Sequence, residues 1–362
     1  MKILMTTDTA GGVWSYAIHL SELLSIQGIQ IVLAAMGTGI SQGQRKQIEQ
    51  LQKKGVKVVF NKMKLEWMED SQEDIVRATD WIWQLYKSES PDLIHLNNYG
   101  QVTQDWDVPT VLVAHSCIAS WWKAVKRTPL PFRFNSYFRM VSEAFEQADA
   151  VVSPTYSIQK SFQKLYGVRS NQLVIYNAVR RSHQIYSPKR KILFAAGRIW
   201  DEGKNISLLL DAAKNIKSEI YIAGPVDGNY SQPANVTFLG ELSKKQVSSW
   251  MRMAMAYVLP VKYEPFGLSF LEAASHSTAL IGGNIDTLKE IWGDAMTYVN
   301  PFNVKELTET CNALTEDMER TIQLGKKAYQ RSGFFSEEEM VKQYQHLYNS
   351  LLYSTRSLLY KL

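Results

Sequence analysis

The sequence predicts an α/β protein built from two doubly wound parallel sheets. Short apolar runs of strand length alternate with amphipathic segments of helix length through most of the chain, which is typical of parallel sheets covered by helices. The chain has 362 residues, enough for two domains of roughly 100–200 residues each. Its hydrophobic content of 45% and charged content of 21% are ordinary for a globular protein.

Eleven apolar segments have the length expected of strands. The domain boundary is expected near Asn177–Pro188, which gives an N-terminal domain of residues 1–180 and a C-terminal domain of residues 181–344. A last helix is expected over about Ser336–Leu352, where apolar and aromatic residues recur at helical spacing. The expected strands are Lys2–Thr7, Ile29–Ala35, Val56–Phe60, Leu93–Leu96, Val111–Ala114, Ala150–Ser153, Ile192–Ala196, Ile220–Ala223, Val236–Leu239, Ala256–Leu259 and Leu280–Ile281.

A segment in the C-terminal third, Tyr263–Ala273, places two carboxylates around a glycine. Glu264 and Glu272 are separated by seven residues, and Gly267 between them permits a sharp turn after an apolar strand. The apolar spacing that follows predicts a helix, whose free N–H groups and positive dipole end suit a phosphate. Carboxylates accept hydrogen bonds from sugar hydroxyls. From the spacing alone, two glutamates on one exposed helix face are an equally good interpretation.

A second segment combines cations with a strand end. The strand Ile192–Ala196 leads into Gly-Arg, a short loop and then Lys-Asn at the start of a helix. Arg198 suits bidentate contact with a phosphate, and Lys204 suits contact as a point charge. The pair could clamp a diphosphate, and a surface loop with scattered charges is the alternative.

Two N-terminal features also lie at expected strand ends. Gly11 and Gly12 form a tight turn between a strand and a helix, where the backbone could approach a phosphate or sugar. The turn lacks the G-x-G-x-x-G pattern, which argues against a nicotinamide-dinucleotide enzyme. His115 follows the strand Val111–Ala114, at the edge where ligands bind open α/β sheets. By position alone, a histidine bonded to local backbone is the better interpretation.

These pieces, in this order, resemble the retaining glycosyltransferases of family 4, the glycogen-synthase-like E-x7-E group of bacterial polysaccharide or glycoconjugate type. The resemblance covers essentially the whole chain and implies a GT-B fold, with two Rossmann-like domains and a C-terminal helix, about 345–362, that joins the N-terminal domain. It implies that His115, Arg198, Lys204 and Glu264 are the catalytic residues. It also implies that the donor is bound by Gly11, Gly12, Leu239, Pro265, Phe266, Gly267, Leu268, Ser269 and Glu272.

The implied donor is a nucleoside diphosphate sugar, with a UDP-sugar favoured, and the implied acceptor is a saccharide or a lipid-linked saccharide. No metal or other cofactor is expected, because the cations can serve the diphosphate. The resemblance is weaker beside the donor sugar: Val261–Tyr263 and Ser277–Ile281 depart from the family pattern. A sugar-nucleotide epimerase and a non-catalytic sugar-nucleotide-binding subunit therefore remain alternatives.

Charge is concentrated in the middle of the chain. Residues 108–200 contain fourteen Lys and Arg against Glu143, Glu146 and Asp149. Within them, Trp121–Phe134 interleaves aromatic and basic residues, which suits an anionic membrane surface or a lipid-diphosphate acceptor, or else a solvated helix over core aromatics. Nucleic acid is not expected, since a diphosphate ligand already accounts for the motifs. The absence of a secretory segment or paired cysteines predicts a cytoplasmic protein, and the basic segment leaves the inner membrane face open.

Overall fold

The chain forms two compact α/β units. The computed structural model describes residues 1–102, 104–167, 171–180, 188–226, 228, 230 and 232–359. Unit 1 comprises Met1–Lys123, Thr128–Tyr176 and the chain from Glu337 onward, and unit 2 comprises Ala124–Arg127 and Asn177–Ser336.

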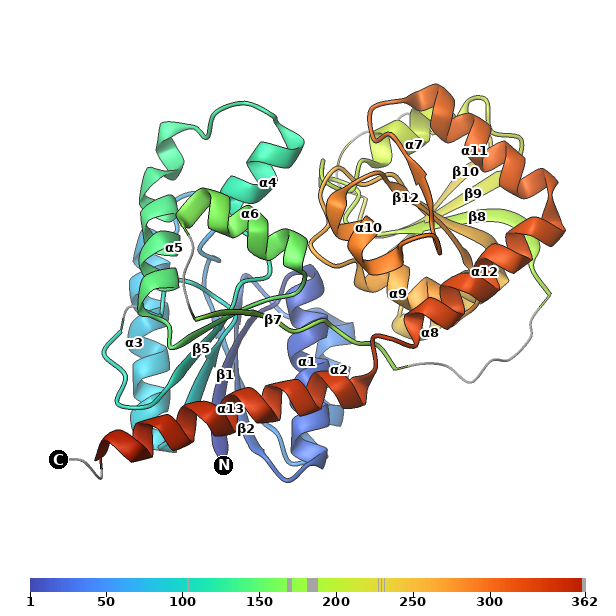
Figure 1. Ribbon diagram of the computed structural model, residues 1–362. Helices are drawn as coiled ribbons and strands as arrows, with labels where there is room; N and C mark the ends of the chain where they lie inside the picture. The colour runs from blue at the N-terminus through green and yellow to red at the C-terminus, as the bar shows by residue number, and fades with distance from the viewer. Residues whose placement is uncertain are drawn as a thin grey trace. The chain divides into compact units, whose positions relative to one another are not determined.

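Within the described residues, unit 1 contains a seven-stranded sheet in the order β3-β2-β1-β4-β5-β6-β7 (Figure 1). Every neighbouring pair of strands is parallel. Strand order reverses between β1 and β4, so the sheet is doubly wound, and its ligand-binding edge is expected at the carboxyl ends of these two strands. The strands are β1 (Lys2–Asp8), β2 (Gln30–Gly37), β3 (Lys57–Lys62), β4 (Leu93–Leu96), β5 (Thr110–Val113), β6 (Ala150–Ser153) and β7 (Gln172–Val174).

Helices lie on both sides of this sheet (Figure 1). The central strands β1, β4, β5 and β6 are buried along nearly their whole length, as expected for parallel strands covered on two faces. The helices of unit 1 are α1 (Gly11–Ile26), α2 (Gln42–Gln52), α3 (Gln72–Glu89), α4 (Ile118–Val125), the 3₁₀ turn η1 (Phe132–Phe134), α5 (Asn135–Gln147), α6 (Tyr156–Tyr166) and α13 (Glu337–Leu359).

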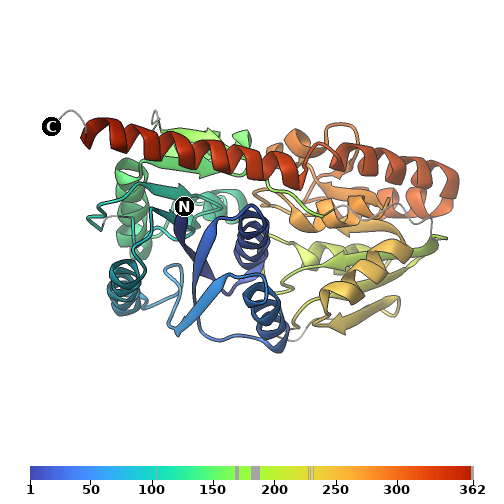
Figure 2. The same ribbon diagram turned by 90° about the horizontal axis from the view of Figure 1, so that it is seen from below.

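Helix α13 lies alongside unit 1 next to α1, as both Figure 1 and Figure 2 show. It carries two fully buried tyrosines, one of which bonds to the sheet and the other to α1. The Tyr348 hydroxyl is 2.7 Å from Nδ1 of His95 on β4, and the Tyr16 hydroxyl donates to that of Tyr344 at 2.5 Å. Hydrogen bonding satisfies these buried polar groups, so α13 is bound to α1 and to β4 through specific contacts as well as apolar ones.

Unit 2 repeats the same topology. Its described residues form a six-stranded parallel sheet in the order β10-β9-β8-β11-β12-β13, which reverses between β8 and β11. The strands are β8 (Arg190–Ala196), β9 (Glu219–Ala223), β10 (Val236–Gly240), β11 (Ala254–Leu259), β12 (Ala279–Gly283) and β13 (Thr297–Val299).

Helices again cover two faces of this sheet, with α7 and α11 on one side and α8, α9 and α12 on the other (Figure 1). Strands β11 and β12 are completely buried between them. None of the helices in the described part of the chain is both long and apolar enough to cross a membrane. The helices are α7 (Ile206–Ala213), α8 (Lys244–Met253), α9 (Leu268–Ser275), α10 (Asp286–Trp292), α11 (Val304–Glu316) and α12 (Met318–Ser332).

The predicted fold class, two doubly wound parallel α/β sheets, is confirmed. The sequence did not predict two of the observed strands, β7 and β13, and both are edge strands of three residues. An edge strand pairs on one side only, and β7 is half-buried throughout, so neither strand leaves an uninterrupted apolar run in the sequence. The last helix continues to Leu359, beyond the Leu352 expected from its apolar spacing.

Candidate active site

The most polar constellation in unit 2 lies where its strand order reverses. Strands β8 and β11 are neighbours in the sheet although β9 and β10 separate them in the sequence. The loop after β8 carries Arg198 and Lys204, and the loop after β11 carries Glu264. Parallel strands end at the same edge, so the topology brings these loops together at the position where open α/β sheets bind ligands.

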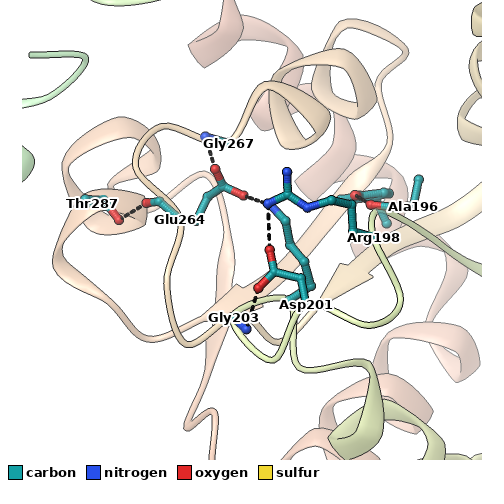
Figure 3. A network of polar contacts seen from close by, with 9 residues as sticks. Ala196, Arg198, Asp201, Gly203, Glu264, Gly267 and Thr287 are labelled. Atoms are coloured by element: carbon teal, nitrogen blue, oxygen red, sulfur yellow. Dashed lines mark hydrogen bonds and ion pairs between the residues drawn. The ribbon is translucent and has the colours of Figure 1, made fainter. Parts of the chain in front are cut away.

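An aspartate organises the loop after β8. Asp201 is buried, accepts a hydrogen bond from the Arg198 guanidinium at 2.7 Å and another from the Gly203 N–H at 2.9 Å (Figure 3). Burial by itself would raise the pKa of Asp201, but the charges of Arg198 and Lys204 and these hydrogen bonds outweigh it and lower the pKa. The aspartate is therefore ionised at neutral pH and holds the guanidinium in place.

The predicted residues Lys204 and Glu264 form an ion pair across the two loops. The ammonium nitrogen of Lys204 lies 2.5 Å from Oε2 of Glu264, and only 18% and 10% of the respective side chains are exposed. The other carboxylate oxygen, Oε1, accepts the N–H of Gly267 at 3.0 Å, and the backbone carbonyl of Glu264 accepts the Thr287 hydroxyl at 2.6 Å (Figure 3). Every polar group of Glu264 that faces the loop is thus partnered.

Helix α9 begins immediately after Gly267, as the sequence predicts. Gly267 has φ +91°, a conformation that favours glycine, and an added Cβ would come within 3.0 Å of the Phe270 ring. The first N–H groups of any α-helix have no partner inside the helix, so the amides of Leu268 and Ser269 point outward from the start of α9. This end of the helix carries a partial positive charge that suits an anion.

The four side chains of these two ion pairs balance each other in charge. Arg198 and Lys204 face Asp201 and Glu264, so the cluster is formally neutral without a ligand. Donor capacity nevertheless remains. Each cation has N–H groups beyond the one used in its ion pair, and the Nε of Arg198 is buried without a hydrogen-bond partner in the described part of the chain. An arriving diphosphate could therefore be bound without breaking either pair.

The remaining predicted donor-binding residues of unit 2 have different surroundings. Phe266 is buried and packs edge to face on Phe335, with ring centroids 5.6 Å apart, so only its backbone could touch a ligand. The Ser269 hydroxyl is engaged with Tyr257 of β11, whose pKa is raised by burial. Leu239 lies at the irregularity where β10 changes register against β9. Pro265, Leu268 and Glu272 are half-buried.

In unit 1, His115 and the glycine turn lie at the carboxyl edge of the sheet. Gly11 begins α1 with φ +62°, and Gly11 and Gly12 are both exposed. Nε2 of His115 is 2.8 Å from Oδ1 of Asn97, and the imidazole packs edge-on against the Tyr16 ring with centroids 4.6 Å apart. Burial lowers the pKa of His115 to about 3, so the ring is neutral. Side-chain hydrogen bonding, not the backbone contact that position alone favours, holds this histidine.

Sequence reasoning missed three polar residues of these sites. Asp201 follows Arg198 by three residues, a spacing that could have indicated an ion pair. Asn97 directly follows β4, so the argument that selected His115 would also have selected it. Glu66 accepts the N–H groups of Tyr99 and Gly100, each at 2.9 Å, and burial raises its pKa to about 7. Nothing in the sequence around Glu66 indicates this contact.

No group of three or more His, Cys, Asp or Glu side chains arranged to hold a metal ion occurs among the residues that the structure describes. Both cysteines, Cys117 and Cys311, are buried free thiols.

Two doubly wound sheets with a cationic, carboxylate-bearing edge define the GT-B class of glycosyltransferases. The glycosyl transferases group 1 model matches residues 177–331, and the glycosyltransferase family 4 model matches residues 10–183. Together the two models take in most of the chain, which belongs to the glycosyltransferases that they describe.

Comparison with individual proteins agrees with this assignment. The chain is 29% identical over 185 residues to the O-antigen chain mannosyltransferase RfbU of Salmonella typhimurium, a match to 47% of this chain and 52% of that protein. It is 34% identical over 96 residues to glycogen synthase of Mycobacterium tuberculosis, covering 26% of this chain and 23% of that one. The chain thus spans about half of the first relative's length and less of the second's.

Solved structures resemble the chain over nearly its full length. Sucrose-phosphate synthase from Thermosynechococcus elongatus has a TM-score of 0.78 at 17% identity, covering 98% of this chain and 100% of that one. HepE from Anabaena, in complex with UDP and glucose, has a TM-score of 0.75 at 15% identity, covering 97% and 100%. At these identities the likeness establishes the GT-B fold.

Proposed function

We propose that the chain transfers a sugar from a nucleoside diphosphate sugar to a saccharide or lipid-linked saccharide with retention of configuration, in polysaccharide or glycoconjugate synthesis. The observation that carries the proposal is the paired arrangement of Arg198–Asp201 and Lys204–Glu264 beside the start of α9. Such an edge offers fixed cations and backbone N–H groups to a diphosphate and a carboxylate to hydroxyls.

Each residue of this edge has a role in the proposed reaction. Negative charge builds on the diphosphate as the bond to the sugar breaks. Arg198, Lys204 and the first amides of α9 would stabilise that charge without reorganising, since their ion pairs already hold them in place. Glu264 would accept sugar hydroxyls through the remaining lone pairs of its carboxylate, and Glu272, further along α9, would face the ribose. Glu264 is not proposed as a covalent nucleophile.

A UDP-sugar is the favoured donor. One structural neighbour, HepE, was solved with UDP and with UDP-glucose, which supports this choice. The mannosyltransferase relative makes GDP-mannose the first alternative to test.

A panel of sugar nucleotides tests the function directly. UDP-glucose, UDP-galactose and GDP-mannose, each compared with its free nucleoside diphosphate, are screened by thermal shift. A true donor at about 100 times its Kd should add about 2.7 kcal/mol of stability. Proton NMR of products formed with and without saccharide acceptors then identifies the anomer. An altered sugar nucleotide in the absence of acceptor would identify an epimerase, and binding without any turnover would identify a binding subunit.

Transfer should survive removal of divalent cations. In the proposed mechanism, Arg198, Lys204 and the start of α9 supply the positive charge that stabilises the diphosphate. We expect initial rates with and without EDTA to agree within about twofold. Complete loss of activity that magnesium or manganese restores would contradict this assignment.

The basic aromatic segment, residues 121–134, is proposed as a peripheral contact with an anionic membrane. Phe132 is 90% exposed, and the neighbouring Arg133 guanidinium lies over the Phe134 ring at 4.9 Å. The other aromatics are occupied, since Trp122 packs against Phe134 with centroids 5.6 Å apart. An apolar tip flanked by a cation suits the boundary between headgroups and acyl chains.

Charge reversal in this segment should weaken vesicle binding. A basic residue near an anionic surface contributes about 1 kcal/mol, so Arg133→Glu should lower partition onto phosphatidylglycerol vesicles at least about fivefold. Phe132→Ser should lower it further. Arg77→Glu on α3 is the matched control, since the Arg77 and Arg133 side chains are both 62% exposed and each lies beside an acid. Equal sedimentation of all variants with vesicles would rule out the contact.

A further inference from the structure

The contact between Asn97 and His115 determines which imidazole nitrogen carries the proton. Nδ2 of Asn97 donates a hydrogen bond to the backbone carbonyl of Thr6 at 2.7 Å. A carbonyl oxygen only accepts, so this side of the amide must be the NH2 group. The opposite side, 2.8 Å from Nε2 of His115, is therefore the oxygen. An amide oxygen also only accepts, and so Nε2 of His115 must carry the hydrogen.

The orientation of Asn97 is held by more than one contact. Its backbone N–H donates to the Thr6 hydroxyl at 2.9 Å, and both residues are buried. Turning the amide over would place two acceptor oxygens 2.7 Å apart inside the protein. Such a reversal loses a buried hydrogen bond and leaves the Thr6 carbonyl unsatisfied. The amide is thus locked, and it locks the imidazole with it.

The second imidazole nitrogen, Nδ1, is then a lone-pair acceptor. Nδ1 makes no hydrogen bond to any residue in the described part of the chain, and His115 is half-buried. The groups that face His115 are the Tyr16 ring from α1, Asn97 after β4 and His95 on β4, and none is a carboxylate. Because no negative group favours an imidazolium here, the ring presents an acceptor across the neutral pH range.

We propose that Asn97 is a positioning residue that holds His115 in the Nε2–H tautomer, so that Nδ1 accepts a hydrogen bond from a hydroxyl of a bound sugar. The identity of that ligand rests on the proposed function, whereas the tautomer rests on Asn97 and Thr6 alone. The assignment also gives His115 a definite polarity. Nδ1 requires a hydrogen-bond donor opposite it and does not protonate a substrate.

Side-chain NMR of the whole chain tests the tautomer without any substrate. Histidine labelled with ¹⁵N gives six imidazole spin systems, and His115→Gln identifies the one that belongs to His115. Wild-type protein should show a protonated Nε2 and an unprotonated Nδ1 that do not change between pH 5.5 and 8. A protonated Nδ1, either as the other tautomer or as an imidazolium, would overturn the proposal.

Asn97→Asp tests the positioning role. One carboxylate oxygen at 97 still accepts from Nε2–H while the other faces the Thr6 carbonyl, so ionisation of the carboxyl is coupled to protonation of His115, and the pKa of His115 should rise by about 1 to 3. Nδ1 would then change from acceptor to donor on protonation. Ser116→Asp is the matched control, because it adds the same charge at an exposed neighbouring position that does not contact Nε2. An equal rise in both variants, or none in Asn97→Asp, would contradict a role for Asn97.

Calorimetry and kinetics then locate the hydroxyl. If it belongs to the donor, the affinity of Asn97→Asp for UDP-glucose or GDP-mannose should fall at least tenfold as His115 protonates, while its affinity for UDP or GDP stays constant. If it belongs to the acceptor, only the KM for the saccharide should rise. Protonation of His115 that changes neither quantity would overturn the sugar contact. Failure of wild-type protein to bind any sugar nucleotide would instead contradict the proposed function, leaving the NMR result to decide the tautomer.

Discussion

Lys204→Met is expected to lower sugar transfer by two orders of magnitude or more. The substitution keeps the aliphatic stem but removes a charge-assisted contact to the diphosphate of about 1.5–3 kcal/mol. It also leaves the carboxylate of Glu264, which is only 10% exposed, without its cation. Both consequences act at the same edge of the sheet, and kcat/KM for the sugar nucleotide should report their sum.

A double substitution separates the two consequences. In Lys204→Met/Glu264→Gln the unpaired carboxylate is gone, so any recovery of affinity for free UDP relative to Lys204→Met measures the cost of leaving Glu264 alone. If Lys204 binds the diphosphate, affinity for free UDP should remain weak in the double variant. Full recovery would show that Lys204 only neutralises Glu264. Lys214→Met removes an exposed ion pair with Asp211 in the same unit and serves as the matched control.

The two carboxylates of the E-x7-E segment should respond oppositely to neutralisation. Glu264→Gln is expected to leave affinity for free UDP unchanged or improved, because it removes a negative charge beside Lys204. Lys204 and the Gly267 N–H contact different oxygens of Glu264, and glutamine replaces one of these oxygens with an NH2 group, so discrimination among donor sugars and most of the transfer rate should be lost. Glu272→Gln should instead weaken UDP itself, by about tenfold or more, as loss of a hydrogen bond to the ribose predicts.

Calorimetry with UDP and then with the intact sugar nucleotide measures both effects. Glu319→Gln, an exposed glutamate in the first turn of α12, provides the control for loss of one charge. A loss of UDP affinity in Glu264→Gln as severe as that in Glu272→Gln would show that the proposed division between sugar and ribose is wrong.

Strand ends and helix starts were readable from the sequence because they depend on local chemistry. Apolar runs such as Ile192–Ala196 and Ala256–Leu259 stand out as buried parallel strands, and Gly267 before an apolar spacing indicates where α9 begins. Chemistry-bearing residues placed directly after such strands could therefore be named as candidates. The short edge strands β7 and β13 lacked this signal, since half-exposed residues do not form apolar runs.

By itself, then, the sequence determined two doubly wound α/β sheets, the loops at their carboxyl edges and the residues with suitable chemistry in those loops. Tertiary structure decided how these residues are paired. Lys204 and Glu264 are sixty residues apart in the chain. They form an ion pair only because the strands they follow, β8 and β11, are neighbours in the sheet. Likewise, Asn97 sets the tautomer of His115 only because β1, β4 and β5 lie side by side and bring the Thr6 carbonyl to the same amide. The direction of a hydrogen bond depends on which donor and acceptor groups come into contact across neighbouring strands. The order of residues along the chain does not specify those contacts.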